Sequence, residues 1–449
     1  MPKLTGTLLL AGLLLCGPAG PAHAADLMVV YQQALQNDPQ IRQAEAAYHA
    51  TQQQHPEARG ALLPQLVLTG DYNSLKQRYK KYHINAAGFG GTSPSDYNGI
   101  YPSYSYGLEL QQALFDAPAF AQLRQADANI GKAEAQYSYA QQQLMLRTAQ
   151  AYFGLLSAKD NLRFARAEKK AIAKQLQQAE HRYKVGVIAN TGVQEARARY
   201  DQANAQVISA RHKVDTAREQ IREIIGSLPQ SLTPLGNDMP LMPPRPESAD
   251  QWVAQAMKNN LQLMAANFQL KAAKDEVSVR QDKRLPKIQL VGSVKRESSD
   301  SPFLNSTSND AAIGVQLNMP LFTGGSMTSS IHQARYQETQ VQQQVVQQQR
   351  ATERSTRDAF HGVNSDISEV KALKQTVKSA RTALAATKSG YEVGTRTTVD
   401  VLNARQDLYK AQRDYANARY QYILDRLKLK LSTGELTRQD LEQVNNWLK

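Results

Sequence analysis

Few side chains in this 449-residue sequence are arranged for covalent chemistry. Its eight histidines include no HExxH zinc-protease motif, and the chain has no GxSxG nucleophile elbow. His49 and His55 are too far apart along a helix to share a face with a common ligand. The single cysteine, Cys16, lies in an N-terminal segment that we expect to be removed. These patterns argue against an enzyme and predict no catalytic, cofactor or metal site.

Polar side chains gather instead near two similar turns, each of which contains a glycine. The stronger group is Tyr391, Arg396 and Asp400, in which Arg396 and Asp400 have the i,i+4 spacing of an ion pair within one helix. The other turn contains Thr191 and Gly192. Their chemistry is that of hydrogen bonds and ion pairs, so the elements that position the two turns decide what these residues do.

Long helical patterns flank both turns. Apolar residues recur every three or four positions through residues 118–184, which predicts one helix about 100 Å long at 1.5 Å per residue. A return helix begins near Val193, and a second one begins near Val401. In these helices one core position of each heptad is nearly always Ala and the other is large, which is typical of closely packed antiparallel coiled coils.

Strict alternation of apolar and polar residues predicts two β-hairpins. Ile288, Leu290 and Val294 alternate with polar residues, and the same pattern appears near Leu66 and Leu108. We expect strands of roughly 10 residues, the length that crosses a bilayer when tilted. A soluble sandwich would show a similar pattern. The connecting loops are expected at residues 83–99 and 298–309.

The same order of elements occurs twice in the chain. Ala34 aligns with Ala256 after a shift of 222 positions, and Tyr183 aligns with Tyr391 after a shift of 208. Each half reads as helix, β-hairpin, long helix and return helix. The helical patterns that open the halves cover residues 26–58 and 248–283. We therefore expect four parts, namely a signal peptide at 1–24, a first structural repeat at 25–226, a Pro-rich linker at 227–246 and a second structural repeat at 247–449.

The signal peptide indicates export. Lys3 supplies its charge, Leu8 to Leu15 its apolar core, and Ala22-His23-Ala24 its cleavage site, so the mature chain would have no cysteine and no disulfide. The formal net charge is +13, but Lys and Arg are scattered among Gln, Asp and Glu. That distribution is typical of solvated helix faces and argues against a nucleic-acid partner.

The segment GYEVGTRTTVDVLNARQDLYKAQRDYAN, residues 390–417, and its counterpart HRYKVGVIANTGVQEARARYDQA, residues 181–203, resemble the TolC family of outer-membrane efflux and secretion channels. The resemblance covers essentially the whole mature chain. It implies a mainly α fold with internal duplication, in which a long antiparallel coiled-coil α-barrel is joined to four membrane β-strands per protomer. Three protomers would close a trimeric 12-stranded barrel in outer-membrane lipid, with the helical tunnel in the periplasm.

The resemblance also implies a function and partners. The expected function is a passive exit duct for drug efflux or type I protein secretion, served by a periplasmic adaptor and an inner-membrane pump or ABC transporter. A periplasmic coiled-coil adaptor of an export system is the alternative. Adaptors have one helical hairpin flanked by compact β domains, whereas this sequence has two hairpins, which favours the duct.

Within the family, the two turns form a gate that closes the periplasmic end of the tunnel. Tyr and Arg of the second turn bond to Thr and Asp of the first, and two Asp residues of the second turn form an acidic ring. The matching positions are Thr191, Gly192, Tyr391 and Arg396 for the periplasmic gate, and Asp400 and Asn403 for the acidic selectivity ring. Gly192 and Asn403 lack the expected carboxylates, so the resemblance implies a gate with fewer polar ties and a ring with half its usual charge.

Overall fold

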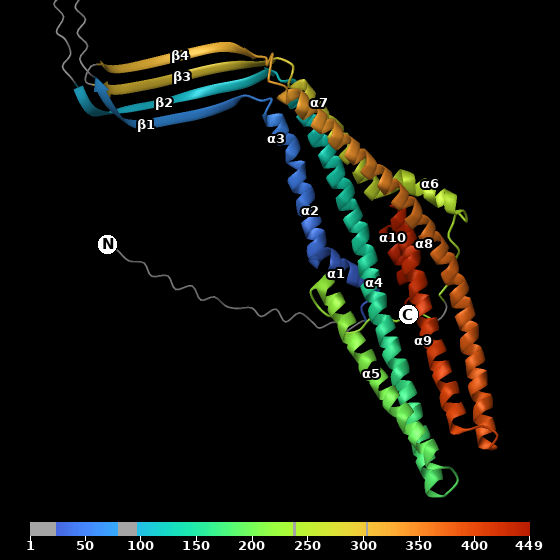
Figure 1. The fold of residues 1–449 in the computed structure, drawn as a ribbon. Helices are drawn as coiled ribbons and strands as arrows, with labels where there is room; N and C mark the ends of the chain where they lie inside the picture. The colour runs from blue at the N-terminus through green and yellow to red at the C-terminus, as the bar shows by residue number, and fades with distance from the viewer. Residues whose placement is uncertain (1–23, 80–96, 237–238, 302–303) are drawn as a thin grey trace, which may run out of the picture.

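The computed structural model describes residues 24–79, 97–236, 239–301 and 304–449, so the predicted signal peptide lies almost entirely outside it. A four-stranded sheet projects from one end of a long helical body (Figure 1). The elements of the first half are α1 (Leu27–Asn37), α2 (Pro39–Gln52), α3 (Gln54–Gly60), β1 (Gln65–Tyr79), β2 (Tyr97–Phe115), α4 (Ala117–Lys184) and α5 (Asn190–Ile225). Those of the second half are α6 (Ala249–Asn259), α7 (Leu261–Asp282), β3 (Lys287–Ser301), β4 (Leu304–Asn318), α8 (Ser326–Glu392), α9 (Thr398–Ser432) and α10 (Arg438–Asn445).

Two helical hairpins, α4/α5 and α8/α9, form most of the body, and α4 also packs against α7 and α9. Helix α4 has 68 residues, which confirms the single long helix predicted from the heptads. The predicted stripe of the return helices is buried or half-buried, and Ala203 and Ala411 are among its buried members. None of the described helices is long and apolar enough to cross a membrane.

The helical segments that open each half are interrupted, whereas the periodicity suggested continuous helices over 26–58 and 248–283. Helix α2 begins at Pro39, a position whose N–H would have no partner within the helix, so proline loses no hydrogen bond there. The Asp38 carboxylate accepts a hydrogen bond from the Gln40 amide at 2.6 Å. Asn260 likewise begins α7 by accepting the Leu263 amide at 2.9 Å. Apolar periodicity continues across such caps, which explains why it did not show the breaks.

The sheet has the antiparallel order β1-β2-β3-β4, and its strands have 15 to 19 residues rather than the roughly 10 expected. The predicted loop at 298–309 is therefore wrong, because β3 continues to Ser301 and β4 starts at Leu304. Polar residues there pair across the ladder, and the hydroxyl oxygens of Ser298 and Thr307 are 3.2 Å apart. The other predicted loop, 83–99, lies mostly outside the described residues.

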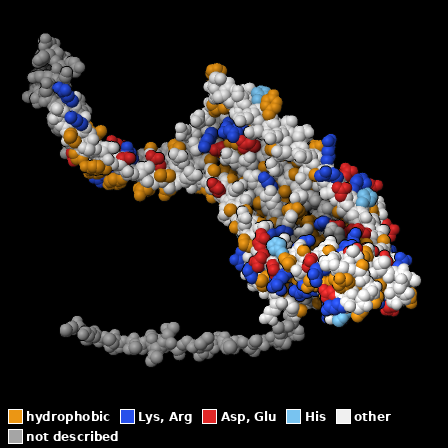
Figure 2. Space-filling view, turned by 60° about the horizontal axis from the view of Figure 1, so that its bottom comes forward, with side chains coloured by type: hydrophobic (Ala, Val, Ile, Leu, Met, Phe, Trp, Pro, Cys, Tyr) orange, Lys and Arg blue, Asp and Glu red, His pale blue; other side chains and the backbone are white. Residues whose placement is uncertain are grey.

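The strand register gives the sheet one apolar and one polar face. A row across the four strands joins Leu68, Leu108, Val294 and Ala311, and these residues share the apolar face. The next row joins Thr69, Gly107, Lys295 and Asp310 on the opposite face. The apolar side chains are exposed to 74% at Leu68 and 62% at Val294. Figure 2 shows hydrophobic side chains along the projecting sheet, whereas Lys, Arg, Asp and Glu crowd the helical body.

The main core lies halfway along the helices, where α1, α10 and the described parts of the segment 227–248 pack against α4 and α9. Tyr152 is fully buried, and its hydroxyl donates to the Thr233 carbonyl at 2.8 Å and lies 3.2 Å from the Ala25 carbonyl oxygen. Buried Asp38 pairs with Arg147 at 2.6 Å. These contacts fix the roots of the long hairpins, whose free ends extend away from the sheet (Figure 1).

Candidate functional site at the helical tips

Each long hairpin ends in a tight turn on the side opposite the sheet (Figure 1). In the first turn Gly186 has φ +75°, and in the second Gly394 has φ +82°, a conformation that favours glycine. The Val187 amide donates to the Arg182 carbonyl at 2.9 Å, and the Thr395 amide donates to the Gly390 carbonyl at 2.8 Å. Both turns are thus closed by their own backbone, and the side chains are available for contacts between hairpins.

Asp400 is the third residue of α9, and it forms a capping box with Thr397, the residue that caps the start of this helix. Its Oδ2 accepts from the Thr397 amide at 2.8 Å and from the Thr397 hydroxyl at 2.9 Å, while the Asp400 amide donates to the Thr397 hydroxyl oxygen at 3.2 Å. The Thr397 amide and hydroxyl, with a weaker effect of Arg396, lower the pKa of Asp400. Asp400 therefore keeps its negative charge at neutral pH. The i,i+4 ion pair with Arg396 is not among the contacts of the described residues.

A cation–π contact joins the two turns. The Arg182 guanidinium, at the end of α4, lies 4.5 Å from the centroid of the Tyr391 ring, at the end of α8. Contacts of this kind are worth about 0.5–1 kcal/mol at exposed sites. The hydroxyl of Thr398 lies 3.5 Å from the Tyr391 hydroxyl, which places Tyr391 between its own hairpin and Arg182.

Farther from the tip, Arg199 joins α5 to α9. Arg199 donates from Nη2 to Asn403 Oδ1 at 3.0 Å and from Nη1 to Gln406 Oε1 at 3.3 Å. Asn403 thus acts in this structure as a neutral acceptor for a cation of the other hairpin. A carboxylate at the same position would turn this hydrogen bond into an ion pair.

Further contacts of the same kind continue toward the core. Buried Glu168 of α4 faces Arg413 of α9 at 4.0 Å, and burial raises the pKa of Glu168 although Arg413 opposes that shift. The Tyr420 hydroxyl donates to Asp160 at 2.8 Å. We call the polar contacts that join the two hairpins the inter-hairpin ladder. Its members are Arg182–Tyr391, Arg199–Asn403, Arg199–Gln406, Glu168–Arg413, Ser157–Asn417, Asn161–Asn417 and Asp160–Tyr420.

The residues predicted for the gate all lie at the tips, and the structure brings some of them into contact with the other hairpin. Tyr391 and Asn403 are members of the inter-hairpin ladder. Thr191 and Gly192 lie in the first turn of α5, and among the described residues neither bonds to Tyr391 or Arg396 within the protomer. Their role in the gate stays a prediction.

Sequence reasoning missed Arg182 and Arg199. Both lie in the segment 181–203 that carries the resemblance, but an arginine on a Gln-rich helix is usually solvated, and its partner is more than 200 positions away. In the part of the chain that the structure describes, no cluster of His, Cys, Asp and Glu could hold a metal ion. The contacts between the hairpins near the tip are hydrogen bonds and a cation–π contact.

The sheet, the paired hairpins and the tips define the class to which this chain belongs. The family described as "Outer membrane efflux protein" matches residues 30–227 and 252–435, and the chain belongs to this family of outer-membrane channels. The chain is 35% identical to the outer membrane protein TolC of Escherichia coli K12 over 98% of its length and 88% of that protein. It is 31% identical to the alkaline protease secretion protein AprF of Pseudomonas aeruginosa, over 94% of this chain and 87% of AprF.

A solved channel structure shares the fold. The CmeC outer membrane channel of Campylobacter jejuni superimposes with a TM-score of 0.76 at 16% identity, over 100% of this chain and 98% of that one. The mainly helical channel fold with a small antiparallel sheet is thereby confirmed. The protein is an outer-membrane exit duct whose helices extend into the periplasm.

Proposed function

We propose that three copies of this chain form a duct that is gated at its periplasmic tips by the inter-hairpin ladder. A periplasmic adaptor and an inner-membrane pump or ABC transporter would deliver the substrate. TolC and AprF, the latter named for the secretion of a protease, support efflux and type I protein secretion as the two candidate tasks. The duct itself would perform no chemistry on its cargo.

Trimer formation is supported by the two faces and the two edges of the sheet. Edge strands β1 and β4 each have 15 residues with backbone groups free to pair with another copy. Four strands cannot close on themselves, and three copies give a closed 12-stranded sheet that is wide enough to leave an open lumen. The apolar face would contact lipid, and the polar face with Lys295 and Asp310 would line the lumen.

Gating is supported most directly by Arg199, which holds α5 and α9 together by two hydrogen bonds beside the tip. The ladder there consists of exposed or half-buried contacts, each weak enough to break and reform. Separation of the α8/α9 hairpin from α4/α5 would break Arg182–Tyr391 and Arg199–Asn403 together. In the trimer, Thr191 and Arg396 would add contacts between neighbouring protomers.

The experiment that tests this function begins with the membrane fraction. Purified outer-membrane protein should migrate as a trimer on an unheated SDS gel and as a monomer after heating. The same sample should give discrete, small currents in a planar lipid bilayer. A soluble periplasmic monomer without currents would instead support the adaptor alternative.

A further inference from the structure

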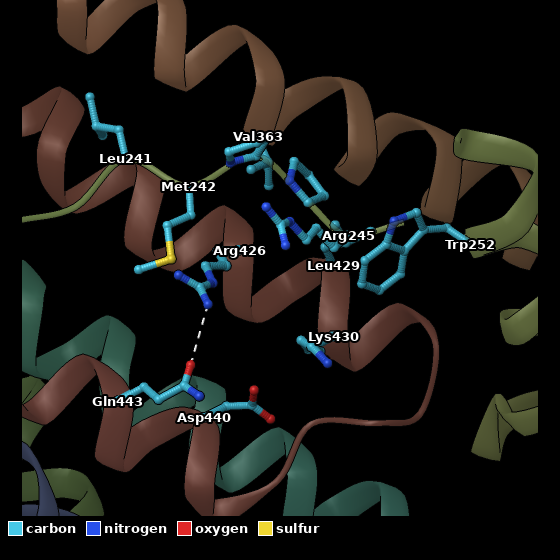
Figure 3. A pocket seen from close by; sticks show the side chains of 12 residues that line it. Leu241, Met242, Arg245, Trp252, Val363, Arg426, Leu429, Lys430, Asp440 and Gln443 are labelled. Atoms are coloured by element: carbon cyan, nitrogen blue, oxygen red, sulfur yellow. Dashed lines mark hydrogen bonds between the residues drawn. The ribbon is translucent and has the colours of Figure 1, made fainter. Parts of the chain in front are cut away.

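A cavity lies beside the main core, far from both the tips and the sheet. Its volume is about 530 Å³, and five segments of the chain contribute to its wall (Figure 3). Residues from the segment before α6 and from α6, α8, α9 and α10 line it, namely Leu241, Met242, Pro243, Pro244, Arg245, Trp252, Val363, Arg426, Leu429, Lys430, Asp440 and Gln443. A cavity of this size fits a small organic molecule.

The cavity carries more positive than negative charge. Arg245, Arg426 and Lys430 line it, against the single carboxylate of Asp440. That carboxylate is occupied, because its Oδ2 accepts from both the amide and the hydroxyl of Thr437 at 2.9 Å. None of the three cations forms an ion pair with another described residue.

Arg426 has unused hydrogen-bonding capacity. Its Nη2 donates to Gln443 Oε1 at 3.3 Å, which Figure 3 shows as a dashed line, and this is the one hydrogen bond of the guanidinium among the described residues. The positive charge of Arg426 therefore stands in the cavity wall without a carboxylate partner among the described residues. The Arg426 guanidinium also lies 5.3 Å from the centroid of the Trp447 ring, which fixes its position.

The rest of the wall is apolar and held in place. Trp252 is buried, and its indole N–H donates to the Pro246 carbonyl at 2.7 Å. The Tyr422 hydroxyl accepts from the Met242 amide at 2.9 Å and donates to the Met242 carbonyl at 3.1 Å. Buried Val363 and Leu429 complete the wall beside Trp252. An apolar group placed here would be desolvated on several sides.

We propose that this cavity binds a small organic anion in which a carboxylate is joined to a compact apolar group. The carboxylate would pair with the cationic groups of Arg245, Arg426 and Lys430. The apolar group would lie against Leu241, Met242 and Pro243, beside the edge of Trp252. A neutral molecule of the same shape would leave the three cations without a counter-charge, and a cationic one would add a like charge, so the site selects anions.

The two tryptophans of the chain make the proposal testable, because Trp252 lines the cavity and Trp447 contacts Arg426. We would titrate the detergent-solubilised full-length trimer with 1-adamantanecarboxylate and follow tryptophan fluorescence. The matched probes are 1-adamantylammonium and neutral 1-adamantanol, which have the same apolar group. The expected result is a saturable change with the carboxylate, with an affinity at least about tenfold above those of the two matched probes.

Variants then assign the binding to the cavity. Arg245→Gln removes an exposed cation that holds no ion pair, so the trimer should fold normally and bind the carboxylate several-fold to about tenfold more weakly. Lys430→Gln should have a similar effect. Arg335→Gln, an equal loss of charge on the exposed surface of α8, should leave the affinity unchanged. Trp447→Phe should retain a signal, which then comes from Trp252.

Three results would overturn the proposal. The first is no saturable signal with the carboxylate. The second is equal affinity for all three adamantyl probes, which would mean apolar partitioning only. The third is unchanged affinity in both Arg245→Gln and Lys430→Gln, since the anion would then bind elsewhere.

Discussion

Replacement of Arg199 by serine should open the periplasmic tip. This arginine makes two hydrogen bonds from α5 to α9, to Asn403 and to Gln406. Serine is too short to reach either acceptor, and it does not disturb the buried stripe of α5, which is formed by residues such as Ala196 and Ala203. The variant therefore removes the contact between the hairpins and leaves each hairpin intact.

The size of the effect follows from the exposure of these bonds. A hydrogen bond to a charged group contributes about 1.5–3 kcal/mol when buried, but exposed charge interactions contribute about 0.2–1 kcal/mol. Asn403 is exposed and Arg199 is half-buried, so we take about 1 kcal/mol per protomer for the pair of bonds. Three protomers acting together would lose about 3 kcal/mol, which changes the ratio of open to closed channel by roughly 100-fold.

Planar-bilayer recordings of single trimers measure this ratio through the mean conductance and the fraction of time spent in the larger state. Arg211→Ser is the matched control, because Arg211 is an exposed arginine of the same helix without a hydrogen bond or ion pair to another described residue. Arg199→Ser should raise the mean conductance, and Arg211→Ser should not. An equal change in both variants would mean that loss of positive charge, rather than separation of the hairpins, sets the conductance. No change in either would refute the role of Arg199.

Three further outcomes follow from the structure. Gly192→Asp should lower the resting conductance in bilayer recordings by giving Arg396 a carboxylate partner, and the new Cβ fits because its nearest neighbour is Ile188 Cδ1 at 3.6 Å. Burial and the neighbouring Asp425 and Glu369 raise the pKa of Asp366 to about 7, whereas Lys428 opposes the shift. The Asp366 carboxyl therefore keeps its proton in the folded protein up to about pH 7, whereas it loses that proton near pH 4 in the unfolded chain. The contribution of this group to the free energy of unfolding is present at low pH and is lost as the pH rises through about 7. Asp366→Asn should remove that part of the pH dependence of thermal unfolding. Ala411→Leu should overpack the buried stripe and lower the free energy of unfolding by about 1–3 kcal/mol in thermal denaturation.

Each of these outcomes has a control. Gly192→Asn has the same shape without the charge, so an equal drop in conductance with Asn would contradict the ion-pair explanation. For Asp366, a difference in melting temperature between variant and wild type that is constant from pH 4 to pH 8 would disprove the assignment. Lys410→Leu, beside Ala411 but exposed, should be nearly neutral, and an equal loss at both positions would mean that the stripe is not the close contact.

The long helices could be predicted because their information is local. Heptad spacing along α4 extends over residues that contact their helical neighbours three and four positions away, so the pattern survives without knowledge of the fold. The break at Asp38-Pro39 was also present in the sequence, as a capping residue before a proline. The apolar periodicity did not reveal the break, because α1 and α2 pack against the same core and their apolar residues form one continuous pattern.

The strand ends and the tip contacts could not be predicted in the same way. Ser298 and Thr307 are typical of loops, yet ladder pairing with neighbouring polar residues keeps them in strands. At the tip, the spacing of Arg396 and Asp400 suggested an ion pair. In the structure the Asp400 carboxylate instead accepts hydrogen bonds from the Thr397 amide and hydroxyl. The bond between Arg199 and Asn403 depends on how two hairpins pack, and no local pattern encodes it.

The placement of the two ends of the molecule relative to the outer membrane is the central claim, and cysteine labelling on intact cells tests it most directly. Ser306 lies near the end of the sheet remote from the helices. Val187 lies in the turn between α4 and α5 and is 64% exposed. Each would be replaced by cysteine. The only native cysteine, Cys16, belongs to the predicted signal peptide. A membrane-impermeant maleimide should label Ser306→Cys on intact cells and Val187→Cys only after the outer membrane is permeabilised. Labelling of Val187→Cys on intact cells, or of Ser306→Cys only after permeabilisation, would contradict an exit duct with its helices in the periplasm.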